Sequence, residues 1–383
     1  MRFEFATSQR MLFGAGTLAE AAPAARSFGR RALVVVGKSA ARAEKLLAQL
    51  QAVQVAASLF QVPDEPTIEM AGSGTAQARA QGCDLVIALG GGSPLDAGKA
   101  IAALLANPGD IYDYLEIVGK GQPLANAPLP FIAIPTTSGT GSEATRNAVL
   151  TDTAQRIKVS LRSALMLPRL AIVDPELTFG LPPAVTAASG MDALTQLLEP
   201  FLSNAANPLA DGFCREGLPR AARALLRAST EEDPQAREDM ALASLLGGMA
   251  LANARLGAVH AFAGPIGGLH GAPHGALCAR LLPLVMQANL KALRARQPQS
   301  ATLDRFTEVA HLLTGRPQAH AEDGIQWLKE LVTALDIPPL SAYGITKADF
   351  EAIVTPAQKA NSMKGNPVEL TKAELEEILE KAV

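Results

Sequence analysis

A run of three glycines followed by a serine could bind phosphate groups. It covers Gly90–Ser93, directly after the apolar run Leu85–Leu89, and a helical pattern continues over Leu95–Leu105. A strand-to-helix turn of this kind exposes backbone N–H groups, and the helix N-terminus adds roughly half a positive charge. With Ser93 at the N-cap and Asp96 at N3, plain helix initiation is the alternative. The turn predicts binding of a nucleotide phosphate.

A second polar cluster, Pro135–Glu143, follows the apolar run Phe131–Ile134. Its nine residues include five hydroxyl side chains and two glycines, which suit a loop that wraps polar ligand groups. A simple hydrophilic turn is the alternative. Open α/β sheets bind ligands at the carboxyl ends of their strands, so two such clusters after two buried strands favour nucleotide binding.

Asp192, Gln196 and three histidines could hold a metal ion. Asp192 and Gln196 lie four apart in a helical pattern, so they share one face and each offers an oxygen. His260, His270 and His274 are three of the five histidines in the chain. An aspartate with two imidazoles suits a divalent transition metal that keeps positions open for substrate. The alternatives are a hydrogen-bonded core histidine and a helix-start carboxylate.

These residues need a sheet to position them, and the first half of the chain supplies its strands. Further strands are predicted at Arg31–Gly37 and Val53–Phe60, with a helix over Pro66–Gln81. This alternation predicts a mostly parallel sheet with helices on both faces. We also expect an N-terminal hairpin, formed by Phe3–Phe5 and Met11–Phe13.

The pattern changes near residue 182. Beyond it, runs rich in alanine and leucine recur at helical spacing, and no stretch resembles a buried strand. The sequence therefore predicts an α/β domain over residues 1–181 and an all-helical domain over residues 182–383.

Composition excludes several classes of partner. The 383 residues suffice for two domains with cores, and a net charge of −3 gives no electrostatic basis for binding nucleic acid or an anionic membrane. No apolar run approaches the length of a membrane span, and the N-terminus lacks a signal-peptide core. Cys83, Cys214 and Cys278 form no CxxC pair, which favours a reduced, cytoplasmic setting.

Together these motifs resemble the iron-containing (group III) alcohol dehydrogenases. The segments that carry the resemblance occur in the family's order along nearly the whole chain: GGGSPLDAGKAIA, PTTSGTGSEAT, DPELT with the following LP, SGMDALTQLLEP and VHAFAGPIGGLHGAPHG. The resemblance implies a nucleotide-binding α/β domain, a helical domain and an active site in the cleft between them. The implied activity is NAD(P)-dependent interconversion of alcohols and carbonyl compounds.

The resemblance also assigns cofactor-binding residues. Gly91, Gly92 and Ser93, with Asp96 in the same segment, would hold the pyrophosphate. The nicotinamide side would be lined by Thr136, Thr137 and Ser142. The nucleotide would be flanked by Lys158 and Leu181.

The implied metal, Fe²⁺ or Zn²⁺, would be held by Asp192, His260 and His274, the last two fourteen residues apart as in the family. The family's second ligand, a histidine, is Gln196 here, and a neutral amide oxygen is a weaker ligand than imidazole. A second family histidine, four residues after the first of the late pair, is Gly264 here. His270 could replace it in proton delivery, so His270 and His274 are the candidate catalytic residues.

The cofactor can be NAD or NADP. Many NAD-specific members carry an aspartate where this chain has Gly37, and that aspartate would repel a 2′-phosphate. Gly37 leaves space and Lys38 could meet a phosphate, so NADP is allowed. The alternative is a turn glycine followed by a solvated lysine.

Other functions on the same scaffold remain as alternatives. One is a maleylacetate-reductase-like enzyme with a weakened or absent metal site, although those relatives often lack the aspartate kept here as Asp192. Another is a dehydroquinate-synthase-like lyase, and a third is a nucleotide-binding protein without catalysis. The expected partner is a small alcohol or carbonyl substrate, and the expected assembly is a homodimer.

Overall fold

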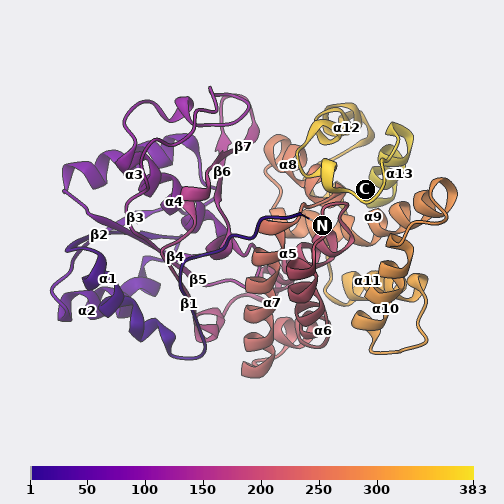
Figure 1. Ribbon diagram of the computed structural model, residues 1–383, viewed down its shortest axis with the longest axis horizontal. Helices are drawn as coiled ribbons and strands as arrows, with labels where there is room; N and C mark the ends of the chain where they lie inside the picture. Colours follow the sequence, from indigo (N-terminus) through magenta and orange to yellow (C-terminus); the bar gives the residue numbers. More distant parts are fainter. Residues whose placement is uncertain (1) are drawn as a thin grey trace. The chain divides into compact units, whose positions relative to one another are not determined.

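The computed structural model describes residues 2–383, which divide into two compact units (Figure 1). The α/β unit consists of Ala6–Thr137 and Gly141–Phe179. The helical unit consists of Gly180–Val383, the loop Ser138–Thr140 and the start of the chain up to Phe5. Two short segments therefore group with the helical unit although they precede residue 181 in the sequence.

The α/β unit is built on a six-stranded sheet with the order β1-β8-β5-β4-β2-β3, and every neighbouring pair is parallel. The predicted parallel sheet is therefore confirmed. Its strands are β1 Met11–Phe13, β2 Arg31–Val36, β3 Ala56–Gln61, β4 Leu85–Gly90, β5 Phe131–Pro135 and β8 Leu170–Val173. Its helices are α1 Ala21–Phe28, α2 Glu44–Ala52, α3 Ile68–Ala80 and α4 Gly92–Ala106.

Helices cover both faces of the sheet, because successive side chains of a buried strand point in opposite directions. Val34 and Val36 of β2 pack with residues of α1 and α2. Leu33 and Val35 of the same strand pack with residues of α3 and α4. A strand that is buried on both faces has a continuous apolar sequence, which is why β2, β4 and β5 could be recognised.

The predicted N-terminal hairpin is wrong. Residues 3–5 form no strand, and β1 pairs in parallel with β8, where Met11 lies opposite Ala171. A three-residue edge strand carries too little pattern to reveal a partner so distant in the sequence. An antiparallel hairpin does occur, between β6 Asn147–Asp152 and β7 Ile157–Arg162, and the sequence analysis missed it.

All regular elements in the described part of the helical unit are helices, as the sequence predicts. They are α5 Pro183–Leu202, α6 Pro208–Thr230, α7 Pro234–Asn253, α8 Ala258–His270, α9 His274–Arg296, α10 Thr302–Thr314, α11 Ala321–Ala334, α12 Phe350–Lys359 and α13 Lys372–Ala382. Short 3-10 turns occur in both units, at Thr17–Glu20, Ala40–Ala43, Ile111–Asp113, Ser142–Ala144, Ala164–Met166, Pro175–Thr178, Leu340–Tyr343, Lys347–Asp349 and Met363–Gly365.

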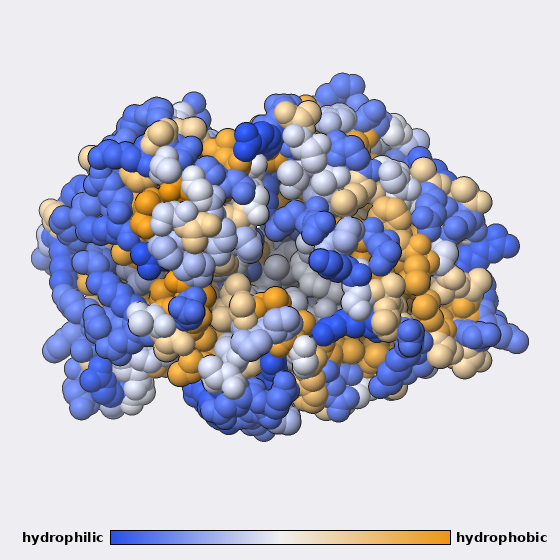
Figure 2. Space-filling view, turned by 180° about the vertical axis from the view of Figure 1, so that it is seen from behind, coloured by the Kyte–Doolittle hydropathy of each residue, from blue (hydrophilic) through white to orange (hydrophobic). Residues whose placement is uncertain are grey.

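Helix α9 is long and apolar enough to cross a membrane, with a mean hydropathy of 1.2 over an 18-residue stretch. However, 72% of that stretch is buried inside the protein, against helices that include α5, α8 and α13. These features are those of a core helix. Hydrophilic residues dominate the face of the molecule in Figure 2, and hydrophobic residues lie between them in small groups.

Helix α4 begins earlier than predicted. Its N-cap is Gly91 rather than Ser93, and no side chain caps it. The carboxylate of Asp96 instead accepts hydrogen bonds from Ser142 Oγ at 2.5 Å and from the Val149 N–H at 3.0 Å. Those partners lie about fifty residues further along the chain, so the local pattern could not show them.

A buried lysine ties α4 to the same loop. Lys99 is 1% exposed, and its Nζ donates to the Ser142 carbonyl and to Thr145 Oγ1, both at 3.0 Å. It also pairs with Asp96 Oδ1 at 3.1 Å. These bonds fix the loop after β5 to the first two turns of α4.

Glu143, beside this lysine, should make the stability of the protein depend on pH. Burial raises the pKa of Glu143 to about 7, although Lys99 acts in the opposite direction. The folded state therefore binds this proton more tightly than the unfolded state. The stabilisation of the folded state by protonated Glu143 is complete below pH 4.5 and is lost as the pH rises through 7.

We therefore expect Glu143→Gln to be more stable than the wild type at pH 8 by up to about 3 kcal/mol, relative to their difference at pH 4.5. Urea unfolding at both pH values measures this. The surface variant Glu20→Gln is the control and should follow the wild type. A Glu143→Gln variant whose advantage does not grow with pH would contradict the assignment.

Candidate cofactor cradle and metal centre

The glycine turn and the hydroxyl-rich loop lie side by side at the carboxyl edge of the sheet. Strand β4 pairs with β5 so that Gly90 lies opposite Pro135, and the Thr136 N–H donates to the Gly90 carbonyl at 2.9 Å. A Cβ added to Gly91 would lie 3.2 Å from Thr137 Oγ1, so a glycine permits this close approach. The two predicted clusters thus form one surface.

The surface that these two clusters form is suited to binding an anion. The first N–H groups of α4, on Gly92 and Ser93, lie beyond an N-cap that provides no side-chain acceptor. Strand β2 pairs with β4 on the other side, which brings Gly37 to the same edge. A Cβ at Gly37 would meet only Pro94 Cγ, at 3.6 Å, so the backbone there has room for a ligand or a side chain.

The remaining predicted cofactor residues are placed differently. The side chains of Asp96 and Ser142 bond to each other, so both hold the loop in place. Lys158, on β7, pairs with Glu65 at 3.1 Å, and Lys38 is exposed. Leu181 belongs to the helical unit, just before the N-cap of α5.

In the helical unit, α5, α8 and α9 bring four potential metal ligands together: Asp192, His260, His274 and Cys278. One ligand atom from each lies within 4.8 Å of every other. Asp192 Oδ1 is 3.5 Å from His260 Nε2 and 3.6 Å from His274 Nε2. Atoms that share a tetrahedral zinc at about 2.0–2.3 Å lie about 3.3–3.6 Å apart, so the spacing fits a metal.

Orphaned polar atoms support the same conclusion. Asp192 Oδ1, Gln196 Oε1 and His260 Nε2 are buried and have no hydrogen-bond partner. Leaving such an atom unsatisfied costs about 1–3 kcal/mol, and three in one place need an explanation. A cation would satisfy Asp192 Oδ1 directly, and His260 Nε2 once that nitrogen has lost its proton.

Glu199 orients the first histidine. Its Oε2 lies 2.6 Å from His260 Nδ1, which leaves Nε2 directed at Asp192. Its Oε1 accepts the Val259 N–H at 2.7 Å and so satisfies the N-terminus of α8, which has no cap of its own. A Cβ at the N-cap Gly257 would lie 2.9 Å from that oxygen, which explains the glycine.

A second close approach positions His274, the first residue of α9. A Cβ at Gly275 would lie 2.3 Å from the Ala188 carbonyl of α5. The glycine therefore lets the N-terminus of α9 pack directly against the α5 backbone, and this packing brings His274 next to Asp192.

Burial and the neighbouring charges act in opposite directions on the pKa values of this site. Burial alone lowers the pKa of His260, but the carboxylates of Glu199 and Asp192 raise it to about 10. Burial would raise the pKa of Asp192, yet His274, His260 and a hydrogen bond from Gln196 hold it below its ordinary value. A metal at this cluster must displace the His260 proton, so its affinity should increase with pH.

The structure places one predicted catalytic residue, His270, away from the metal-type cluster. His270 lies about 15 Å along α8 from His260, at the C-terminal end of the helix, and its Nε2 is 3.8 Å from Asp349. The structure therefore does not bring His270 to the cluster for proton delivery. At Gly264, one turn after His260, an added Cβ would meet nothing within 4 Å.

Two residues of the site were missed from the sequence. Glu199 follows Asp192 by seven residues and Cys278 follows His274 by four, so both lie on the ligand face of their helices. Helical spacing could have suggested both. Neither was recognised because a lone glutamate or cysteine in an apolar helix has no distinguishing neighbour in sequence.

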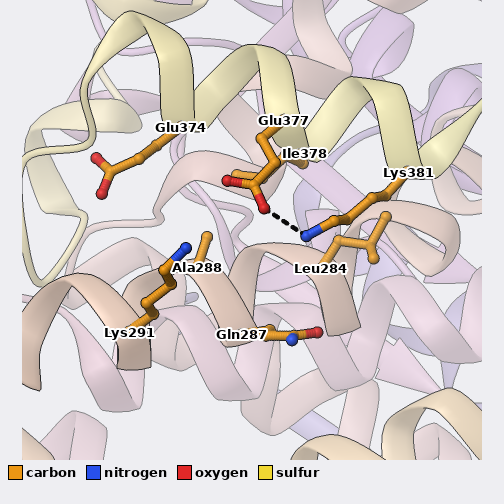
Figure 3. A pocket seen from close by; sticks show the side chains of 8 residues that line it. All are labelled: Leu284, Gln287, Ala288, Lys291, Glu374, Glu377, Ile378 and Lys381. Carbon is orange, nitrogen blue, oxygen red and sulfur yellow. Dashed lines mark hydrogen bonds and ion pairs between the residues drawn. The ribbon is translucent and has the colours of Figure 1, made fainter.

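A surface groove lies elsewhere, between α9 and α13 (Figure 3). Lys381 Nζ pairs with Glu377 Oε1 at 2.6 Å, and Leu284 and Ile378 supply apolar surface. The groove lacks the convergent donors of the metal cluster. Its lining residues are Leu284, Gln287, Ala288, Lys291, Glu374, Glu377, Ile378 and Lys381.

Comparison with known proteins identifies the same two regions. Residues 8–175 match the model of the iron-containing alcohol dehydrogenases, and residues 186–383 match that of the C-terminal part of the Fe-containing alcohol dehydrogenase family. Alcohol dehydrogenase 4 of Schizosaccharomyces pombe is 36% identical over 379 residues, covering 97% of this chain and 87% of the relative.

Two further relatives are similar over most of their length. 1,3-Propanediol dehydrogenase of Klebsiella pneumoniae is 37% identical over 360 residues, covering 89% of this chain and 90% of the relative. The crystal structure of a 1,3-propanediol oxidoreductase superposes with a TM-score of 0.93 and 34% identity, covering 100% of both chains.

Removing the negative charge of Glu199 should weaken metal binding. In Glu199→Gln the His260 ring loses the carboxylate that orients it, and such a loss typically costs 10–100-fold in affinity. Competition with a chelator, followed with Zn²⁺, measures the dissociation constant. Glu238→Gln, on the exposed surface of α7, should bind like the wild type. Equal affinity of Glu199→Gln and the wild type would refute the orienting role.

Proposed function

The chain belongs to the iron-containing alcohol dehydrogenase family, and we propose that Asp192, His260 and His274 hold its divalent metal while the glycine turn holds NAD(P). As a member, it is an oxidoreductase that interconverts alcohols with aldehydes or ketones by hydride transfer. One observation carries the metal assignment: buried, unsatisfied atoms of Asp192 and His260 lie 3.5 Å apart.

In the α/β unit, the chain's own contribution is binding and orientation. The N–H groups of Gly92 and Ser93 would neutralise a pyrophosphate, helped by the partial charge of the α4 N-terminus. Gly91 allows the backbone to approach, and the hydroxyls of Thr136 and Thr137 provide donors beside it. The loop after β5 keeps this shape because Lys99 and Asp96 of α4 form hydrogen bonds with it.

In the helical unit, Glu199 would hold the Nδ1 proton of His260, so that Nε2 can bind the metal once it has lost its own proton. Asp192 supplies a negative charge, and Gln196 bonds to its carboxylate. When bound, the metal supplies Lewis acidity toward the substrate oxygen, and the nicotinamide supplies or accepts the hydride. With His270 outside the cluster and His274 a proposed metal ligand, proton delivery falls to ordered water.

The substrate class and the setting are further parts of the proposal. A relative named for 1,3-propanediol supports a short-chain primary alcohol or diol and its aldehyde as substrates. We also place the enzyme in the cytoplasm as a homodimer, on the grounds of its cysteine pattern and of the prevalence of twofold dimers.

Activity should depend on the metal and on His274. Dialysis against a strong chelator is expected to abolish aldehyde reduction, and added Zn²⁺ or Fe²⁺ to restore it. His274→Ala should lower kcat/KM by at least about 100-fold, because the Lewis acid supplies several kcal/mol of transition-state stabilisation. His311→Ala, on α10, is the matched control and should retain activity. Full activity after chelation together with an active His274→Ala variant would exclude the metal.

Cofactor preference should respond to Gly37. We propose that the wild type accepts NADPH, because the space at Gly37 leaves room for a 2′-phosphate. Gly37→Asp should lower kcat/KM with NADPH by at least about tenfold and affect NADH less, since the carboxylate repels the phosphate. Lys38→Gln tests the neighbouring charge separately. A wild type with equal rates on both cofactors, unchanged by Gly37→Asp, would contradict the proposal.

A further inference from the structure

We propose that Cys278 is a ligand of the metal centre, and that its thiolate gives this chain a zinc-type donor set. The inference deepens the proposed function and rests on its metal site. The ligands would be Asp192, His260, His274 and Cys278, with Gln196 outside the first coordination sphere.

The position of Cys278 carries the first part of the argument. It lies one turn after His274 on α9, and its Sγ is 3.7 Å from His274 Nε2. Sulfur and nitrogen atoms that share a tetrahedral zinc lie about 3.5 Å apart, for bond lengths of about 2.3 and 2.0 Å. The sulfur belongs to the set of four ligand atoms that lie within 4.8 Å of one another.

The neighbouring side chains give a second, independent indication of a ligand. Asp192 is 1% exposed, yet its Oδ1 has no hydrogen-bond partner. Asp192 Oδ1 is directed into the same set of atoms as the sulfur. A thiol alone would be a small core residue, but a thiol beside an orphaned carboxylate oxygen and two imidazoles forms a metal-binding set.

Donor chemistry favours Cys278 over Gln196. An amide oxygen is neutral and hard, whereas a thiolate is anionic and soft, and soft sulfur ligands select zinc over hard-ligand metals. Asp192, two histidines and a thiolate form a tetrahedral N₂OS set.

The other buried cysteine of the helical unit provides a control. Cys214 is 0% exposed on α6 and packs in the hydrophobic core. Burial raises the pKa of the Cys214 thiol, and it belongs to no metal-type cluster among the described residues. Burial is therefore common to both cysteines, and only the neighbouring donors distinguish Cys278.

Cobalt substitution tests the proposal directly. The wild-type chain is stripped of metal and loaded with one equivalent of Co²⁺, and its absorption spectrum is recorded. We expect a sulfur-to-cobalt charge-transfer band in the near ultraviolet, together with intense visible bands of tetrahedral cobalt. Cys278→Ser should lose the charge-transfer band, and Cys214→Ser should keep it. X-ray absorption of the zinc-loaded wild type should show a sulfur neighbour at about 2.3 Å.

The outcomes distinguish the proposed role of Cys278 from the proposed metal site itself. Stoichiometric cobalt binding without the sulfur band overturns the role of Cys278 and leaves the proposed metal site intact. Failure of the wild type to bind cobalt or zinc overturns both. The wild-type spectrum decides the matter even if Cys278→Ser does not fold.

A comparison of affinities distinguishes the two candidate fourth ligands. By competition with a chelator, Cys278→Ser should weaken zinc binding by at least about 100-fold, since it removes a charged ligand. Gln196→Leu should weaken it by less than about tenfold. The reverse order would assign the fourth position to Gln196 and reject the thiolate.

Discussion

The hydrogen bond between Glu199 and His260 organises the helical unit around its site. A buried carboxylate is costly unless it is satisfied, and Glu199 meets this requirement with the His260 ring and the backbone N–H of Val259. One carboxylate thus both caps α8 and orients the His260 ring. The potential metal ligands of α5 and α9 can share a metal with His260 because its ring is held in this orientation.

The α/β unit positions its candidate site through its backbone rather than through charged side chains. Parallel strands place their carboxyl ends at one edge, so residues far apart in sequence meet there without any side-chain contact of their own. Gly91 and Gly37 then keep the edge open, while the buried Lys99 and Asp96 hold the loop beside it. The proposed phosphate-binding surface is thus supported by the buried ion pair between Lys99 and Asp96.

Local patterns predicted much of this, and their failures share one cause. The continuous apolar strands and the helical second half are visible because each depends on neighbouring residues in sequence. The Asp192, His260 and His274 set was predicted from residue type and from the resemblance to the family's motifs. The missed features depend on partners far away. Ser93 lies inside α4 while the Asp96 side chain binds Ser142 and Val149, and β1 is defined by its pairing with β8.

By itself the sequence determined the alternation of strands and helices, and it predicted a phosphate-binding turn and three metal-type side chains. These follow from periodicity, backbone chemistry and residue type, which need no knowledge of distant contacts. Only the tertiary structure decided that Glu199 and Cys278 join the site and that His270 does not. The physical reason is that the packing of α5, α8 and α9 sets which helix faces meet, and the atoms left unsatisfied in that interface define the site.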